Sequence, residues 1–287
     1  MFDTVTSRLD PLLYFIVVLP LSLAALVVGY LYASRRRKPE DEKAGWAFGL
    51  GQAAIFGLIA LILGFSFSFA AARYEARRAL VVDESGAIMT AYLRAAFLPA
   101  ASTARFRKLL IDYTRTRLDT YADVGKGDVR GEEESIGRGK ELQGELWAMA
   151  TTAARHDPRS PFYADLTRSV IETIGVAEKQ EAALNNHVPR AIIGIILLCT
   201  IIGALLLGLT FGRVKAPNAF LSVIFCLLFG ATVFTIIDLD HPQGGFISVD
   251  IAPIQSTLDD MTTEGATRLI RSHVSTFEKA QASPRKR

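Results

Sequence analysis

The reactive side chains of this 287-residue chain form no pattern that is typical of catalysis. A metal site on a helix commonly uses two histidines one turn apart, and the four histidines are too widely spaced for that: His156, His187, His241 and His273. We find no nucleophile beside a base and no carboxylate pair at a useful spacing. We therefore predict that the protein is not an enzyme, binds no metal and uses no cofactor.

A row of apolar residues has a spacing that suits ion passage instead. Four small side chains recur every four residues, and two bulky ones continue the row: Gly45, Gly49, Ala53, Gly57, Leu61 and Phe65. Small residues at this spacing let helices approach closely, which predicts helix packing for the first four. Bulky apolar side chains can close a water path, which predicts a pore constriction at the last two. The alternative, that Leu61 and Phe65 face lipid or a neighbouring helix, remains open.

Three arginines follow this row, at Arg73, Arg77 and Arg78. At the mouth of a pore they would favour anions electrostatically. No ionisable side chain lies within the apolar runs described next, so a proton relay or a coupled-ion site is disfavoured. This pattern favours a channel over an active transporter.

Hydrophobic residues make up 50% of the chain and are concentrated in four runs without a charged residue or histidine. Each run exceeds the roughly 18 apolar residues that suggest a membrane span: Pro11 to Ala33, Ala44 to Ala72, Ala191 to Gly212 and Ala216 to Ile237. We predict an all-α, polytopic protein held in membrane lipid by four transmembrane helices. The second run is too long for the hydrocarbon core and should continue past Arg73.

These runs divide the chain into two transmembrane hairpins, a helical extramembrane domain between them, and a C-terminal segment with a short helix and a disordered basic end. In chain order, these parts are residues 1–72, 73–188, 189–237 and 238–287. Cys199 and Cys226 fall inside spans, where cysteine usually packs as a small apolar residue. The formal charge of +3 and the absence of a long basic tract exclude nucleic acid as a partner.

The middle region reads as several amphipathic helices. Four apolar residues are spaced to share one helix face: Phe106, Leu109, Leu110 and Tyr113. Breaks are predicted at Pro99 to Ser102, at the glycine-rich stretch Gly125 to Glu134, and at Asp157 to Pro161. Basic residues cluster at the connection within each hairpin, which places those connections in the cytoplasm and the middle region outside.

A longer pattern resembles the pore helix of bestrophins, a family of anion channels. Those channels carry Leu-Gly-Phe, then an Arg-Trp-Trp-Glu-Ala-Arg type of segment, then an Asp-Ser pair, all on one long helix. This chain has Leu63-Gly64-Phe65, Arg73-Tyr74-Glu75-Ala76-Arg77 and Asp83-Glu84-Ser85. After the fourth span, His241-Pro242-Gln243-Gly244 resembles the family's Asn-Pro-Phe-Gly segment. The chain is most similar to the bacterial bestrophin-like membrane proteins, through Glu84 to Arg94 and Asp238 to Pro242.

The resemblance implies a homo-oligomeric channel, pentameric as in bestrophins, that conducts an anion such as chloride across a bacterial inner membrane. It matches Leu61 and Phe65 to the apolar neck of the pore, although Gly57 departs from the bulky residue expected one turn earlier. It also implies a cytosolic middle domain, against the loop charges. The family's calcium-binding acidic run has no counterpart after Gly244.

Four residues form a motif after the fourth span: Asp238, Asp240, Pro242 and Gly244. We expect the two carboxylates to interact with neighbouring helix ends rather than to bind an ion. A second function also remains open, that of a non-conducting membrane scaffold or sensor whose middle domain binds a protein partner.

Overall fold

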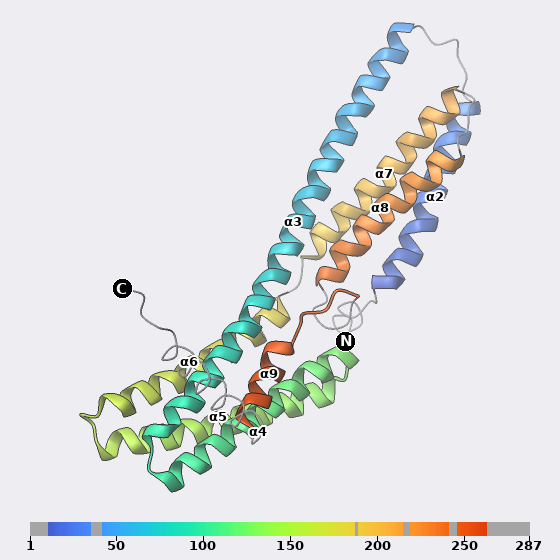
Figure 1. The fold of residues 1–287 in the computed structure, drawn as a ribbon. Helices are drawn as coiled ribbons and strands as arrows, with labels where there is room; N and C mark the ends of the chain where they lie inside the picture. Colours follow the sequence, from blue (N-terminus) through green and yellow to red (C-terminus); the bar gives the residue numbers. More distant parts are fainter. Residues whose placement is uncertain (1–10, 36–41, 187–188, 215–218, 241–245, 263–287) are drawn as a thin grey trace, which may run out of the picture. The chain divides into compact units, whose positions relative to one another are not determined.

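The computed structural model describes residues 11–35, 42–186, 189–214, 219–240 and 246–262. Within these residues the chain contains helices and no strand, which confirms the predicted all-α fold. Figure 1 shows the elements, which in chain order are α2 (Pro11–Arg35), α3 (Glu42–Arg94), η1 (Ala95–Phe97), α4 (Ala100–Lys126), α5 (Val129–His156), α6 (Pro161–Asn185), α7 (Arg190–Val214), α8 (Ala219–Asp240) and α9 (Ala252–Met261).

Four helices are long and apolar enough to cross a membrane, and they confirm the predicted spans. Their segments are Ile16–Arg35, Gly45–Phe97, Ala191–Arg213 and Phe220–Asp240. Most of the side chains in these segments are not buried inside the protein, so lipid or another protein chain must cover them.

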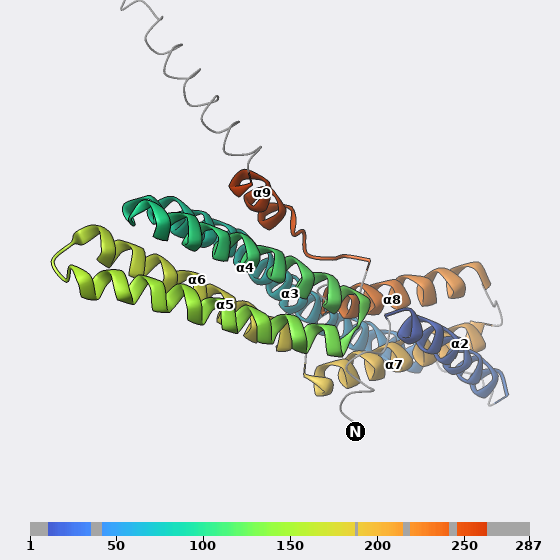
Figure 2. The ribbon, with the colours of Figure 1, turned by 90° about the horizontal axis from the view of Figure 1, so that it is seen from below.

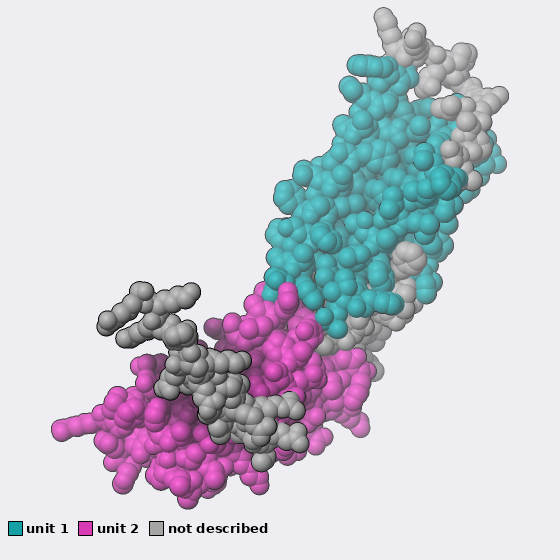
Figure 3. Space-filling model, in the orientation of Figure 1, with its two compact units in different colours: residues 1–75, 186–248 teal, residues 76–185, 249–287 magenta. Residues whose placement is uncertain are grey.

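The chain divides into two compact units, coloured separately in Figure 3. Unit 1 contains residues 1–75 and 186–248, and unit 2 contains residues 76–185 and 249–287. The predicted C-terminal segment is shared, because its beginning belongs to unit 1 and α9 belongs to unit 2. Helix α3 contributes residues to both units, because the boundary after residue 75 falls within it.

In unit 1, α7 and α8 pack against both α2 and α3 (Figure 1). One core contains side chains of α3, α7 and α8, among them Ile59, Leu63, Ile196, Val233 and Ile236. A second core joins α2 to α7 and α8 through Leu26, Ala204 and Cys226. Both cysteines are buried and unpaired, as the sequence predicts.

In unit 1, glycine residues allow α2 and α7 to approach each other closely. A Cβ atom at Gly208 would clash with the backbone carbonyl of Leu26, and one at Gly29 would clash with the carbonyl of Leu205. Gly208 and Gly212 are four residues apart, the spacing that lets two membrane helices approach closely. By contrast, nothing lies within 4 Å of a Cβ built at Gly49 or Gly57.

Unit 2 is a bundle in which α4, α5 and α6 run side by side, as Figure 2 shows. The predicted face of α4 is confirmed, because Phe106, Leu110 and Tyr113 are fully buried. The predicted break at Gly125 to Glu134 is much shorter than expected. Helix α4 ends at Lys126, Gly127 adopts the left-handed conformation with φ of 70°, and Asp128 caps α5 by accepting from the backbone N–H of Gly131.

The contact between α2 and α7 predicts the effect of one methyl group. Gly208→Ala should lower the free energy of unfolding by roughly 1–3 kcal/mol, because the methyl meets backbone atoms that cannot rotate away. Gly194→Ala on the same helix is the matched control, since it has nothing within 4 Å and should be neutral or stabilising by up to about 1 kcal/mol. Thermal unfolding in detergent measures both, and equal melting temperatures would contradict the close packing.

Candidate pore-lining helix

Helix α3 is one continuous element of 53 residues. At 1.5 Å per residue it extends roughly 80 Å, well beyond a hydrocarbon core of roughly 30 Å. This confirms the prediction that the second apolar run continues past Arg73. Only part of α3 is therefore needed to cross the membrane, and the rest of the same helix extends beyond it.

A stripe of buried residues follows α3 from Ile59 into η1 at steps of three, four or seven, which keeps it on one side of the helix. The stripe consists of Ile59, Leu63, Ser66, Ala70, Arg77, Val81, Glu84, Ile88, Ala91 and Ala95. Residues two positions away from members of this stripe point to the opposite side, because each residue advances the helix by about 100°. We call that opposite side the outward face.

Leu61 and Phe65 belong to the outward face. Leu61 lies two residues from both Ile59 and Leu63, and its side chain is 55% exposed. The side chain of Phe65 is 59% exposed. Both side chains are therefore available to line a path, to contact lipid, or to contact a second copy. Their role as a constriction stays a prediction.

Of the four small residues ahead of them, Gly49 and Gly57 do not approach another described helix of this chain closely. Gly49, Ala53 and Gly57 are exposed, and open space surrounds the two glycines. Steps of four residues also turn the row by about 40° each, so that only Gly57 comes near the outward face. Their predicted role in helix packing therefore requires a partner outside the protomer and stays untested.

The three arginines after the row do not share one side of α3. Arg77 is only 2% exposed, and its Nε donates to the backbone carbonyl of Ala183 at 3.1 Å, in the last turn of α6. Arg73 lies beside α8, with 3.9 Å between its Nη1 and Oδ1 of Asp240. Arg78 is exposed. Arg77 thus satisfies a carbonyl at a helix end, and its place in the buried stripe argues against the predicted position at a pore mouth.

The carboxylate of Asp238 holds the chain that follows α8. Asp238 is fully buried, and its two oxygens accept from the backbone N–H groups of Phe246 and Ile247 at 2.8 Å each. A carboxylate that accepts two such bonds is well compensated for its burial. Pro242 and Gly244 of the same motif lie outside the described residues.

Sequence reasoning missed a buried polar network in unit 2. Glu84 of α3 accepts from Nε of Arg117 at 2.5 Å and from the hydroxyl of Tyr121 at 3.0 Å. Nε2 of Gln180 on α6 donates to the same hydroxyl at 2.5 Å. All four side chains are less than 10% exposed. The network ties α3 to α4 and α6, and its position is fixed by the buried stripe to which Glu84 belongs.

A polar contact also links two predicted spans. The hydroxyl of Thr210 on α7 donates to Oε1 of Gln52 on α3 at 2.8 Å, and Nε2 of Gln52 donates to the backbone carbonyl of Leu206. Hydrogen bonds of this kind stabilise helix association in lipid. Both residues are uncharged, so the absence of ionisable side chains from the spans does not exclude such a contact.

The electrostatics of the network follow from burial around one carboxylate. Burial raises the pKa of Tyr121 well above its usual range, and the charge of Glu84 raises it further. Tyr113 behaves in the same way for the same two reasons. Burial alone would lower the pKa of Arg117, but the carboxylate of Glu84 outweighs it and the pKa is raised. Arg117 therefore keeps its charge, and both tyrosines keep their protons.

The buried ion pair predicts an asymmetric pair of arginine variants on α4. Arg117→Met leaves the carboxylate of Glu84 buried without its cation, which should cost about 3–5 kcal/mol of unfolding free energy. Arg115→Met is the matched control, because Arg115 is exposed and pairs with Asp112 at the surface, and it should cost less than about 1 kcal/mol. Chemical denaturation in detergent measures both. Equal losses would show that the Glu84 pair is not the anchor of the bundle.

The two tyrosines predict a loss of stability in alkali. Their pKa values are raised on folding, so the folded state retains protons that the unfolded state releases above a pH of about 10. The free energy of unfolding should therefore fall as the pH rises beyond that value, and Tyr121→Phe should make the fall shallower. Melting temperatures between pH 8 and about 11 test this, and identical slopes in the variant and the parent protein would contradict it.

Comparisons with known proteins agree with this architecture. A family model described as the Bestrophin-like domain matches residues 19–254. A solved structure of a point variant of a bacterial bestrophin homologue from Klebsiella pneumoniae is similar with a TM-score of 0.63 and 18% identity, and the match covers 86% of this chain and 97% of that chain. A second structure of that homologue has a TM-score of 0.59, 19% identity and coverages of 87% and 97%.

A search of curated proteins finds no match. The structural similarities, at their low identities, show a shared fold. The family model carries more weight, because it extends from the first span to the beginning of α9 and so includes all four membrane helices. The chain belongs to the bestrophin-like family.

Proposed function

We propose that this protein is an ion channel of a bacterial inner membrane, in which several copies of the chain surround a path lined by α3. The observation that carries the proposal is the outward face of α3. This face carries large, exposed apolar side chains at Leu61 and Phe65, and the helix continues without interruption well beyond the length of a membrane span.

Self-association is supported by apolar side chains that lipid does not explain. Trp147, Phe162 and Ile171 lie on α5 and α6, which are too polar to be membrane spans, yet each side chain is at least 40% exposed. Exposed apolar groups of this size favour contact with another protein surface. In a single protomer Leu61 and Phe65 lie on the surface. A closed path along them therefore requires further copies of the chain. The pentameric count rests on the family resemblance.

Leu61 and Phe65 are the proposed constriction of this path. Rings of apolar side chains gate ion flow by excluding water from a narrow passage. A path that is closed in this way conducts better when the side chains are shortened. The anion preference predicted from the three arginines has less support, because Arg77 is buried and Arg73 lies beside Asp240.

The constriction predicts the direction of a change in conductance. In liposomes containing the purified protein, Leu61→Ala and Phe65→Ala should each raise ion flux several-fold, because less work is needed to wet the passage. Phe67→Ala is the matched control: Phe67 is 44% exposed but lies about 200° around the helix from Phe65, and its variant should conduct like the parent protein.

Three results would count against the proposal. Unchanged flux in both constriction variants would remove their gating role. Equal increases in all three variants would point to loosened packing instead of a gate. No flux in the parent protein, together with a monomeric particle in mild detergent, would favour the scaffold or sensor function.

A further inference from the structure

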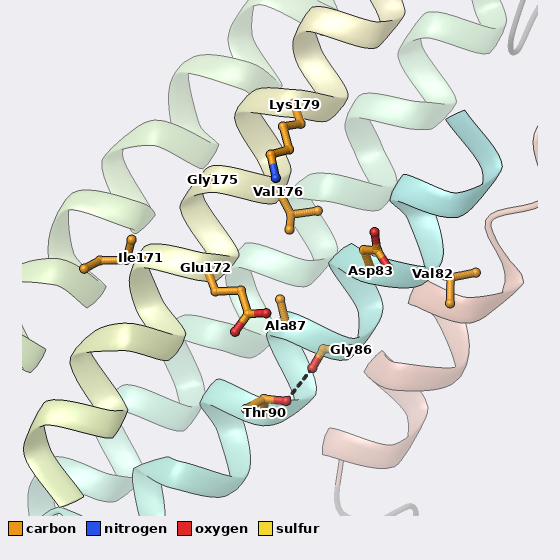
Figure 4. A pocket seen from close by; sticks show the side chains of 10 residues that line it. All are labelled: Val82, Asp83, Gly86, Ala87, Thr90, Ile171, Glu172, Gly175, Val176 and Lys179. Atoms are coloured by element: carbon orange, nitrogen blue, oxygen red, sulfur yellow. Dashed lines mark hydrogen bonds between the residues drawn. The ribbon is translucent and has the colours of Figure 1, made fainter. Parts of the chain in front are cut away.

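A cavity of about 660 Å³ lies in unit 2 between α3 and α6. Figure 4 shows the side chains that line it, with those of α3 on one side and those of α6 on the other. Cavities of this size are typical of small-molecule sites in proteins. The lining contains three charged side chains, namely Asp83, Glu172 and Lys179.

Two glycines open the middle of this cavity. A Cβ atom built at Gly86 of α3 or at Gly175 of α6 has no described atom within 4 Å. Glycine weakens the interior of a helix, and at these positions it does not serve close packing, in contrast to Gly208 of α7. The missing side chains leave room for another molecule above Ala87 and Val176, which are buried and form an apolar floor.

The two helices run antiparallel beside the cavity. Nε of Arg77 donates to the carbonyl of Ala183 at 3.1 Å, and Nη1 of Arg94 donates to the carbonyl of Asp165 at 3.0 Å. The chain of α3 therefore advances in the direction in which α6 returns. Arg94 lies on the same side of α3 as Asp83, but its guanidinium bonds to that carbonyl and it does not belong to the lining.

This register orders the polar groups along the cavity. At one end, Asp83 of α3 and Lys179 of α6 lie within about one helical turn of the same level. At the other end, Glu172 lies near Thr90, whose hydroxyl donates to the carbonyl of Gly86 at 2.8 Å and keeps lone pairs that can accept. Glu172 and Lys179 are seven residues apart on α6, which is about 10 Å along the helix axis.

The three charged side chains are available to a ligand. Within the part of the chain that the structure describes, no ion pair or side-chain hydrogen bond holds Asp83, Glu172 or Lys179. One end of the cavity thus offers a carboxylate and an ammonium group together, and the other end offers a second carboxylate. A complementary molecule carries a cation and an anion at one end and a second cation at the other.

We propose that this cavity binds a free α-amino acid with a cationic side chain, such as arginine. An α-amino acid carries its ammonium and carboxylate groups on one carbon atom, so these groups pair with Asp83 and Lys179. The aliphatic stem lies over Gly86 and Gly175, and the guanidinium reaches Glu172, to which it can donate two parallel hydrogen bonds. The inference goes beyond the proposed function, because binding does not require conduction.

The affinity should be modest, because the charged groups of the cavity are exposed to water. Ion pairs at such positions are screened and individually weak. We expect a dissociation constant on the order of 1 mM. Removal of one charge pair should weaken binding roughly threefold or more.

Saturation-transfer NMR on the full-length protein in a non-ionic detergent tests the choice of ligand. The titration compares L-arginine with two analogues: L-citrulline, which replaces the guanidinium by a neutral urea group, and agmatine, which lacks the carboxylate. L-Arginine should give a saturable signal, and each analogue should bind roughly threefold or more weakly.

Variants assign each preference to one side chain. Glu172→Gln should remove the preference for arginine over citrulline, and Lys179→Met should remove the preference for arginine over agmatine. Glu178→Gln is the matched control, since Glu178 is an exposed residue of α6 outside this lining, and it should change neither preference. Gly175→Leu should fill the cavity and abolish binding without lowering the melting temperature, because leucine favours a helix more than glycine does.

Each preference is a ratio measured on one protein sample, so a change in the folded fraction does not affect it. No saturable signal from L-arginine, equal affinities for the three compounds, or unchanged binding in the Gly175→Leu variant would overturn the inference. None of these measurements uses ion flux. A protein that binds arginine in this way and conducts no ions would therefore contradict only the proposed function.

Discussion

The structure depends on the fact that lipid offers no hydrogen bonds to a peptide backbone, so every charge-free run must form a helix. Helices α2, α7 and α8 pack against each other, and close approach of α2 and α7 is possible because Gly29 and Gly208 have no side chains. From Ile59 onward, helix α3 is buried along one stripe, whereas Leu61 and Phe65 on the opposite side are exposed. The uncovered side is what remains to meet lipid, water or a second copy.

In unit 2, the buried stripe of α3 is anchored by an ion pair with α4. Glu84 occupies a position that an apolar residue would fill elsewhere, and Arg117, Tyr121 and Gln180 supply its hydrogen bonds. A buried ion pair contributes little net stability compared with apolar packing, but it tolerates few alternative arrangements, because any shift leaves a charge unpaired. We hypothesise that it fixes the register of α3 against α4 and α6. A fixed register determines which residues face outward.

The membrane helices were predictable because hydropathy alone defines them, and the bestrophin likeness followed from short motifs along α3. The buried stripe was harder to predict, since Arg77 and Glu84 are charged and a charged residue normally indicates a solvated position. The packing role of the small residues on α3 stays a prediction, because a four-residue spacing identifies a compatible surface but not its partner. The close contact that depends on glycine within the chain lies between α2 and α7. The roles of Leu61 and Phe65 depend on what covers them, which no single chain contains.

Thiol modification on α3 tests most directly whether its outward face lines water. Single cysteines at Leu61, Phe65 and Asp83, and at the buried positions Ile59 and Ala70, would be exposed in liposomes to a charged reagent that cannot dissolve in lipid. The native cysteines are buried and should add little background. We predict rapid modification at the three outward positions and slow modification at the two buried ones. Protection of Leu61 and Phe65, with reaction only at Asp83, would place that face against lipid or protein and contradict the account.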